Sequence, residues 1–285
     1  MLPHRGQKTS NTVLKQPLSI LIRTFNSAHT LGRVLGELDL IDSDQCIIVD
    51  SGSTDRTFEI ADRFGAEVVH ARGDFHYSKS LNLGFEVAHW PWVLVLSSHC
   101  IPARENLLEQ FRRVIAGNCE NLAVVYGKSS LYMLPDDGFS VHYGDSEKWQ
   151  AGQFHPGANT IAMYSKEVWA RKRFRRDIPT AEDHDWFVWA MKEGYRACAL
   201  PNAVVLYRNK GSLNHMFKKG MLECRTLELV YGSSRGRNSF KVCFKWFLKM
   251  CRKSTKLLLC QKIDFGTYVR MCAHHLGSLV SYFRR

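Results

Sequence analysis

The stretch IIVDSGSTD, residues 47–55, decides the fold class of this 285-residue chain. It starts as an apolar, β-branched run, reaches an acid at Asp50, turns on a glycine and continues into a segment with helical periodicity. A strand that leads through such a turn into a helix is typical of a βα unit, in which Ser53 or Thr54 suits the N-cap and Asp55 suits the first helical turn. A second interpretation gives the Asp50 carboxylate a ligand, because it can accept the ring N–H of a uracil or thymine base.

The same unit recurs along the first half of the chain. Apolar strands and the helix-period segments that follow them are expected at residues 18–25 and 30–40, 46–50 and 55–64, 67–71 and 77–87, and 92–96 and 103–116. This alternation predicts an α/β fold with a mostly parallel sheet and flanking helices. Ligands of such sheets bind outside the carboxyl ends of the strands, so we expect Thr24, Asp50, Arg72 and Ser97 on one rim.

The second half is less regular. We expect an irregular insertion at residues 131–157, a strand at 159–164, a helix at 181–192 and helical structure beyond 211. The domain boundaries that follow are a polar N-terminal tail at 1–16, an α/β catalytic domain at 17–210 and a basic helical C-terminal extension at 211–285.

Charge is concentrated near the C-terminus. The net charge is +12, and the residues after Glu228 contain twelve Lys and Arg against Asp264 alone, which gives +11 there. The nine cysteines are scattered without the short paired spacings of zinc or redox sites, so reduced thiols and a cytoplasmic location are expected. No signal peptide or membrane-spanning run is visible, and any membrane association would be peripheral, on the inner face of the cytoplasmic membrane.

The basic extension predicts an amphipathic helix within residues 240–260. Cations on one stripe are Lys241, Lys245, Lys249, Arg252 and Lys256, and the opposite stripe holds Phe240, Phe244, Phe247, Cys251 and Leu258. Such a helix can lie on an anionic membrane, or it can pack its apolar stripe on the catalytic core and leave the lysines in water. Both interpretations stay open.

Two segments together resemble a known family. ILIRTFN at 20–26, followed by DSGSTD at 50–55, looks like the opening of the family 2 glycosyltransferases, which have the Rossmann-like GT-A fold. The resemblance implies that Phe25 stacks on the nucleotide base and that Asp50 binds it. It implies further donor contacts from neighbouring positions, namely Thr24, Asn26, Ser51, Ser53 and Asp55. Two residues depart from the family pattern: Arg23 replaces the usual proline, and Ser51 stands where some members have an acid.

The helix expected at 77–87 carries a second part of the resemblance. FHYSKSLNLG at 75–84 is similar to the family's helix that faces the donor, which implies a contact between Lys79 and the diphosphate. A cation beside a diphosphate is physically sensible. The alternative is an exposed lysine on an amphipathic helix.

The segment SSHC at 97–100 stands where the family has an Asp-x-Asp signature that holds a divalent metal. The resemblance implies manganese or magnesium as cofactor, with Ser97 and Ser98 at the donor, but both acids are absent and His99 replaces one of them. Imidazole can ligate manganese, whereas magnesium prefers oxygen. Three interpretations remain: His99 is a metal ligand, it contacts phosphate without metal, or the site is degenerate. His215 stands where some GT-A enzymes contribute a late histidine to the metal, although a surface histidine explains it equally well.

The sequence TAEDHDW at 180–186 resembles the family's Glu-Asp motif. The resemblance implies that Asp183 is the general base of an inverting transfer and that Glu182 orients it or binds acceptor. The alternative is acid enrichment at a helix N-terminus. Acceptor contacts are expected from His155, Asn159 and Trp186.

The function implied is that of an inverting glycosyltransferase. It would move a hexosyl or deoxyhexosyl group from a UDP- or dTDP-sugar to a saccharide or lipid-linked acceptor in polysaccharide or glycolipid assembly, with rhamnosyltransferase-like members as one subset. The alternative is a catalytically inactive protein that binds nucleotide sugars. A nucleic-acid-binding protein is not favoured, because no recognition motif is present.

Overall fold

The computed structural model describes residues 16–73, 76–117, 120–130, 141–151, 153–154, 156–207, 212–231, 254–255 and 265–280. The chain divides into two compact units. The first unit comprises residues 1–75, 79–174 and 189–208, and the second comprises 76–78, 175–188 and 209–285.

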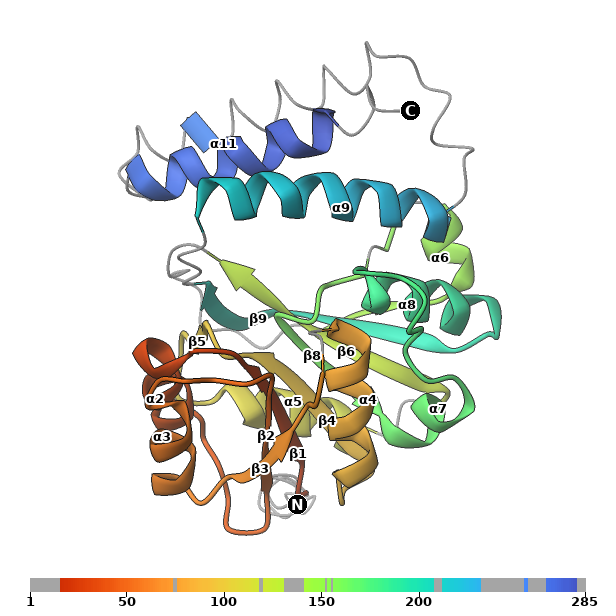
Figure 1. The fold of residues 1–285 in the computed structure, drawn as a ribbon. Helices are drawn as coiled ribbons and strands as arrows, with labels where there is room; N and C mark the ends of the chain where they lie inside the picture. The colour runs from red at the N-terminus through yellow and green to blue at the C-terminus, as the bar shows by residue number, and fades with distance from the viewer. Residues whose placement is uncertain are drawn as a thin grey trace, which may run out of the picture. The chain divides into compact units, whose positions relative to one another are not determined.

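The first unit is built on one sheet (Figure 1). Its strands are β1 (Ser19–Thr24), β2 (Gln45–Asp50), β3 (Glu67–His70), β4 (Trp92–Ser97), β5 (Cys100–Pro102), β6 (Leu122–Ser130), β7 (His142–Gly144), β8 (Ile161–Ser165) and β9 (Arg196–Tyr207). The strand order is β3-β2-β1-β4-β8-β6-β9-β5, and β7 pairs with β9. The predicted α/β class is confirmed.

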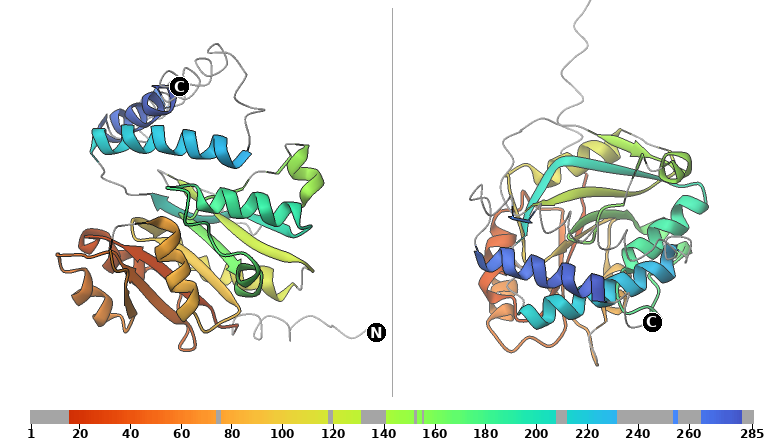
Figure 2. Two further views of the ribbon diagram at one scale, coloured as in Figure 1. Left: turned by 45° about the vertical axis from the view of Figure 1, so that its right-hand side comes forward. Right: turned by 90° about the horizontal axis from the view of Figure 1, so that it is seen from above.

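The two halves of the sheet differ in strand direction. The pairs among β3, β2, β1 and β4 are parallel, as the strand and helix alternation predicts. From β8 onward the sheet is mixed, since β8 is antiparallel to both β4 and β6 while β6 and β9 are parallel. Figure 2 shows the strands from two further sides.

Helices accompany the strands. They are α2 (Ala28–Gly36), α3 (Thr57–Arg63), α4 (Tyr77–Val87), α5 (Leu107–Ala116), α6 (Ser146–Gln150), α7 (Lys166–Arg171), α8 (Glu182–Lys192), α9 (Leu213–Tyr231) and α11 (Phe265–Val280). The helices predicted at 55–64 and 103–116 begin later in the structure, since α3 starts at Thr57 and α5 at Leu107. Residues 100–102 form β5, a short strand that was not predicted and that pairs with β9. The insertion predicted as irregular contains β7 and α6.

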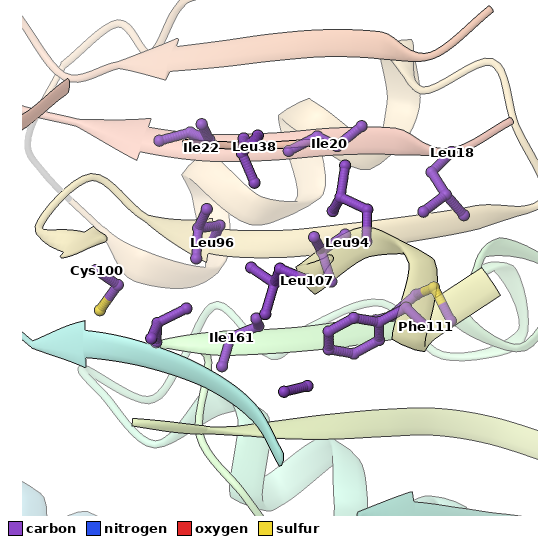
Figure 3. Close-up of a cluster of buried hydrophobic side chains, with 14 of the residues drawn as sticks. Leu18, Ile20, Ile22, Leu38, Leu94, Leu96, Cys100, Leu107, Phe111 and Ile161 are labelled. Atoms are coloured by element: carbon purple, nitrogen blue, oxygen red, sulfur yellow. The ribbon is translucent and has the colours of Figure 1, made fainter. Parts of the chain in front are cut away.

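One face of the sheet carries the main hydrophobic core (Figure 3). Ile20 and Ile22 of β1 point to this face, and Leu94 and Leu96 of β4 do the same, because side chains alternate along a strand. Helices α2 and α5 cover them, the latter with Phe111. The remaining alternate positions of β1 and β4 therefore point to the opposite face.

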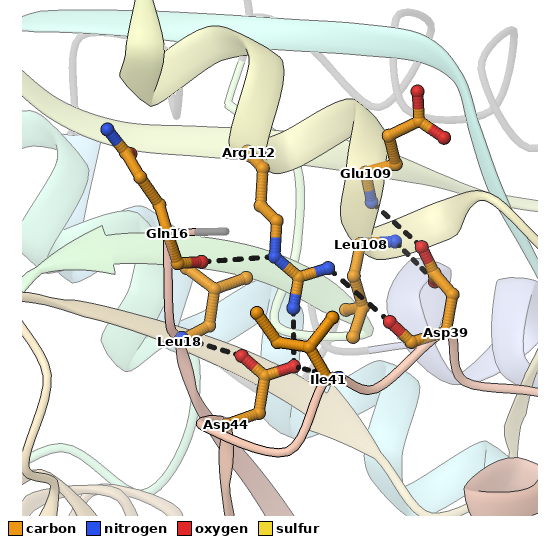
Figure 4. Close-up of polar contacts among 8 residues, drawn as sticks. All are labelled: Gln16, Leu18, Asp39, Ile41, Asp44, Leu108, Glu109 and Arg112. Carbon is orange, nitrogen blue, oxygen red and sulfur yellow. Dashed lines mark hydrogen bonds and ion pairs between the residues drawn. The ribbon is translucent and has the colours of Figure 1, made fainter. Parts of the chain in front are cut away.

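A buried ion pair joins α5 to the beginning of the sheet (Figure 4). Arg112 donates to the backbone carbonyl of Gln16 at 3.1 Å and pairs with Asp44, whose Oδ1 accepts from the Leu18 N–H at 2.8 Å. Asp39 accepts from the first backbone N–H groups of α5, and burial raises the pKa of its carboxyl. Removing either Arg112 or Asp44 would leave the other as an uncompensated buried charge. Because both residues also bond to the backbone at Gln16 and Leu18, this cluster holds the start of β1 in place.

The second unit contains the helix pair α9 and α11, which lie side by side in both views of Figure 2. An ion pair between Glu223 of α9 and His274 of α11, with Nε2 and Oε2 2.9 Å apart, joins them. Among the helices that the structure describes, none is long and apolar enough to cross a membrane.

Candidate active site

The first cluster lies where β1 and β2 end, and its centre is Asp50. This carboxylate is fully buried. Its Oδ2 accepts from the Thr24 hydroxyl at 2.8 Å and from the Ser53 hydroxyl, and its Oδ1 accepts from the N–H groups of Gly52 and Ser53 at 2.8 and 2.7 Å. Four donors occupy the lone pairs of one carboxylate, so Asp50 holds the two loops together.

The adjoining loop presents an exposed aromatic ring. Phe25 is 59% exposed, and Asn26 has a φ of 48°, a left-handed conformation that is uncommon outside glycine. Two hydrogen bonds hold Asn26 in this conformation: its N–H donates to the Ser53 hydroxyl at 2.8 Å, and its Oδ1 accepts from the Thr54 N–H at 2.8 Å. The ring is therefore available for stacking and its backbone is fixed, as a base platform requires.

The start of α3 corrects one expectation. The helix begins at Thr57, so neither Ser53 nor Thr54 is its N-cap. Asp55 accepts from the Thr57 N–H at 3.1 Å and from the Ala28 N–H at 3.0 Å. Desolvation would raise the pKa of the Asp55 carboxyl, but a hydrogen bond from the Thr57 hydroxyl, together with those from the two N–H groups, holds the pKa below its ordinary value. Asp55 thus joins the β2–α3 loop to the start of α2.

Two further predicted donor contacts lie in this half of the sheet. Lys79 of α4 directs its ammonium to the Arg72 carbonyl in the loop after β3. Ser51 is half-buried, and its hydroxyl oxygen is buried without a hydrogen-bond partner among the described residues. Both contacts with a donor stay predictions.

The end of β4 carries Ser97, Ser98 and His99. The Ser97 hydroxyl donates to the Asn159 carbonyl at 3.1 Å, and the Ser98 hydroxyl lies 2.8 Å from that of Ser27. The His99 ring packs edge-on against Tyr207, with 4.8 Å between ring centroids. Both serine hydroxyls are thus engaged within the protein.

This set of donors does not suit a divalent metal. Magnesium requires several oxygen ligands, and manganese also favours carboxylates, yet neither Ser97 nor Ser98 supplies an anionic oxygen here. Within the described residues no three or more His, Cys, Asp or Glu side chains are grouped as metal ligands would be. A metal ligand role for His99 stays a prediction that the chemistry of its neighbours does not support.

The structure places the three predicted acceptor-binding residues in different environments. Asn159 is buried, and its Oδ1 accepts from the Tyr164 hydroxyl at 2.7 Å, so it connects the β8 strand to the end of β4. His155 lies outside the described residues. Trp186 has no exposed surface, which gives no support to its predicted acceptor contact.

The second unit contains the acidic start of α8. Glu182, Asp183 and Asp185 all lie in the first helical turn and all are buried, Asp183 being 8% exposed. The Asp183 Oδ1 accepts from the His184 N–H at 2.9 Å. Acids that only complement a helix dipole are usually in water, so the burial of three of them favours a functional role for this turn.

Sequence reasoning missed two residues that shape this turn. Arg175 donates to Asp185 at 3.0 Å and to Asp177 at 2.7 Å, and the Asp177 hydrogen bond together with Asp185 raises the pKa of the guanidinium. Ala181, directly before the helix, has a φ of 57°, which is strained for alanine. An Arg near two acids could have been noticed in the sequence, whereas no local pattern announces the strained backbone.

The remaining predictions fall elsewhere. His215 is exposed in the first turn of α9, where its N–H donates to the Ser212 hydroxyl at 3.2 Å. The predicted amphipathic stripe of 240–260 lies outside the described residues, apart from 254 and 255.

Comparison with solved structures supports the fold. A mannosyltransferase from Pyrobaculum calidifontis, described in complex with GDP-Man and Mn2+, is 14% identical with a TM-score of 0.59, and the alignment covers 96% of this chain and 92% of that one. Glucosyl-3-phosphoglycerate synthase from Mycobacterium tuberculosis, in complex with Mn2+, UDP-glucose and phosphoglyceric acid, is 16% identical with a TM-score of 0.55, covering 79% and 85%. At these identities the likeness establishes the fold alone.

Comparison with sequences identifies the family. A search of curated proteins found no match. The profile described as "Glycosyl transferase family 2" matches residues 19–171, which include β1, the Asp50 turn, α4 and the end of β4. This match spans more than half of the chain, and the chain therefore belongs to glycosyltransferase family 2, whose members use nucleotide sugars as donors.

Proposed function

We propose that this glycosyltransferase catalyses an inverting transfer from a nucleoside-diphosphate sugar to a hydroxyl group, with Asp183 as the general base. The observation that carries the proposal is the turn of buried acids at the start of α8, in a chain of this family. A carboxylate is one of the groups that can take the proton of an attacking hydroxyl as a general base.

The proposed reaction assigns the bond changes to a single displacement. The acceptor oxygen forms a bond to the anomeric carbon from the face opposite the diphosphate, while the bond between that carbon and the diphosphate oxygen breaks. The proton of the acceptor hydroxyl passes to the Asp183 carboxylate, and Glu182 orients the acceptor. The leaving diphosphate takes the electron pair of the broken bond.

Donor recognition is proposed to rest on the loops after β1 and β2. Phe25 offers the exposed ring for the base, and the hydrogen bonds around Asp50 and Asn26 hold that ring in place before a ligand arrives. The solved relatives are described with GDP-mannose or UDP-glucose. For this chain we propose a UDP- or dTDP-sugar; no comparison supports the rhamnosyl subset.

The acceptor and the location are also proposals. The family resemblance supports a saccharide or lipid-linked acceptor. The sequence of the basic extension, whose stripe lies outside the described residues, supports a peripheral position on an anionic membrane. Sedimentation with anionic vesicles at low and high salt measures the membrane part directly.

The test is the variant Asp183→Asn, assayed with the donor that a panel of nucleotide sugars identifies. Turnover should fall by about 10²-fold or more, because an amide cannot accept the proton, and donor affinity measured by calorimetry should stay within about twofold. Glu193→Gln, an exposed acid just after the same helix, serves as the control and should keep full turnover.

Two results would contradict this proposal. Full turnover in Asp183→Asn would remove this residue as the base. Binding of a donor by the wild type without transfer to any acceptor would favour the inactive nucleotide-sugar-binding protein instead.

A further inference from the structure

Two departures from the family pattern lie side by side on the neighbouring strands β1 and β4. In the register of β1 and β4, Arg23 is the direct partner of Ser97. Arg23 replaces a proline of the family, and Ser97 replaces the first acid of the metal signature. Neighbouring strands lie about 5 Å apart, so these two changes concern one place at the rim.

Both side chains leave the sheet on the same face. Ile22 and Leu96 point into the core shared with α2 and α5, so the next residues along each strand, Arg23 and Ser97, point away from it. Leu21 has the same orientation as Arg23 and lies against Gly84 of α4, where an added Cβ would come within 2.1 Å of a Leu21 methyl. This face is the one on which the family resemblance places the donor.

The position of Arg23 also suits a cation that binds the donor. Arg23 is the last residue but one of β1, at the carboxyl edge of the parallel strands, where α/β sheets bind their ligands. It is half-buried, and a charge that is partly withdrawn from water acts more strongly on an anion than one at the surface. Guanidinium is permanently charged and offers a planar fork of donors that fits phosphate oxygens.

The change at residue 97 has a consequence for this charge. An aspartate there would place a negative charge opposite Arg23, whereas Ser97 carries no charge and its hydroxyl donates to the backbone carbonyl of Asn159. The loss of the acid and the gain of the guanidinium therefore act in the same direction. Both make the end of β4 more positive without a metal ion.

We propose that Arg23 contacts the diphosphate of the donor and supplies the positive charge that the family otherwise takes from a divalent metal. This inference rests on the proposed function. When the bond between the anomeric carbon and the diphosphate oxygen breaks, the electron pair moves to that oxygen, and the Arg23 N–H groups donate hydrogen bonds to the charge that develops there.

The experiment measures nucleotide binding by calorimetry, which needs no turnover. Wild type, Arg23→Gln and Arg23→Lys are titrated with UDP and dTDP, in EDTA and separately in Mn2+, and with uridine and thymidine, which lack the diphosphate. Arg33→Gln on α2, an exposed arginine away from the rim, is the matched control. Thermal unfolding of each variant reports whether it is folded.

The expected results separate the diphosphate from the base. Wild-type affinity for the preferred nucleoside diphosphate should differ by less than about threefold between EDTA and Mn2+. Arg23→Gln should weaken that affinity by about tenfold or more yet change nucleoside binding by less than about threefold. The nucleoside diphosphate affinity of Arg23→Lys should lie between those of the wild type and Arg23→Gln. Arg33→Gln should match the wild type.

Three results would overturn the inference. A wild-type affinity that rises tenfold or more with Mn2+ would show that a metal supplies the charge. Equal binding by folded Arg23→Lys or Arg23→Gln and wild type would show that Arg23 does not contact the diphosphate. Failure of the wild type to bind any nucleotide or nucleotide sugar would instead overturn the proposed donor class itself, and the inference with it.

Discussion

Two turns at the rim of the first unit's sheet stand at acidic positions of the family, and they differ in what has become of the acid. After β2, Asp50 is retained, buried and surrounded by four donors. After β4, serines replace the acids, and their hydroxyls bond to Asn159 and Ser27. In this chain an acid is present where it organises the backbone, and serines bonded within the protein stand where the family resemblance implies a metal-binding acid.

The largest effect in this comparison is expected for Asp50→Asn. The amide keeps the shape but presents an N–H₂ group where hydroxyl and backbone donors now point, so the free energy of unfolding should fall by about 3 kcal/mol. Denaturant unfolding measures the change. Asp62→Asn, an exposed acid on α3, should change the stability by less than about 0.5 kcal/mol. A stable Asp50→Asn with lost nucleotide binding would mean that Asp50 serves the base and not the loops.

A smaller effect is expected for Asn26→Ala, next to the exposed ring. Alanine would lose the hydrogen bond from Thr54 and would have to keep a φ of 48° without compensation, which together should cost about 1–2 kcal/mol of stability. Asn26→Gly loses the same bond but tolerates the backbone, so it should be more stable than the alanine variant by about 1 kcal/mol.

The same pair of variants tests the positioning of Phe25. If the Asn26 contacts fix the ring, nucleoside affinity should fall several-fold in Asn26→Ala and partly return in Asn26→Gly. Thermal unfolding and calorimetry on the two variants measure stability and binding separately. Unchanged nucleoside affinity in a destabilised Asn26→Ala would show that this residue supports the fold alone.

The first half of the fold was predictable because its information is local. Each βα unit carries its own apolar strand and helix-period segment, and these parallel strands are sequential neighbours apart from β1 and β4. The mixed half depends on pairings over long distances in the chain, such as Cys100 with Tyr207, and no periodicity specifies such a register. That is why β5 was not predicted.

The site was predictable as a set of positions and less so as a set of roles. Motifs pointed to Asp50 and Asp183, but only the structure gives the hydrogen bonds that occupy Asp50 and the burial of Asp183. The function of Asp55 as a link to Ala28 was not foreseen, because it depends on where α3 begins. The pairing of Arg23 with Ser97 required the strand register.

The smallest expected effect, for Ser98→Ala, decides how the end of β4 is to be understood. Ser98 is buried and its hydroxyl is shared with Ser27, whose own hydroxyl also reaches the Phe25 carbonyl at 3.3 Å. Removal of the Ser98 hydroxyl therefore leaves Ser27 with a partner, and the loss of one neutral hydrogen bond should cost only about 0.5–1 kcal/mol.

Nucleoside diphosphate affinity of Ser98→Ala should stay within about twofold of the wild type, because the hydroxyl is engaged in the protein and not turned to a ligand. Denaturant unfolding and calorimetry on Ser98→Ala, with Ser97→Ala measured beside it, give both quantities. A tenfold loss of affinity at unchanged stability would make Ser98 a donor contact, as the family resemblance implies. The turns after β2 and β4 would then both bind the ligand, and they would differ only in the ligand atoms that they contact.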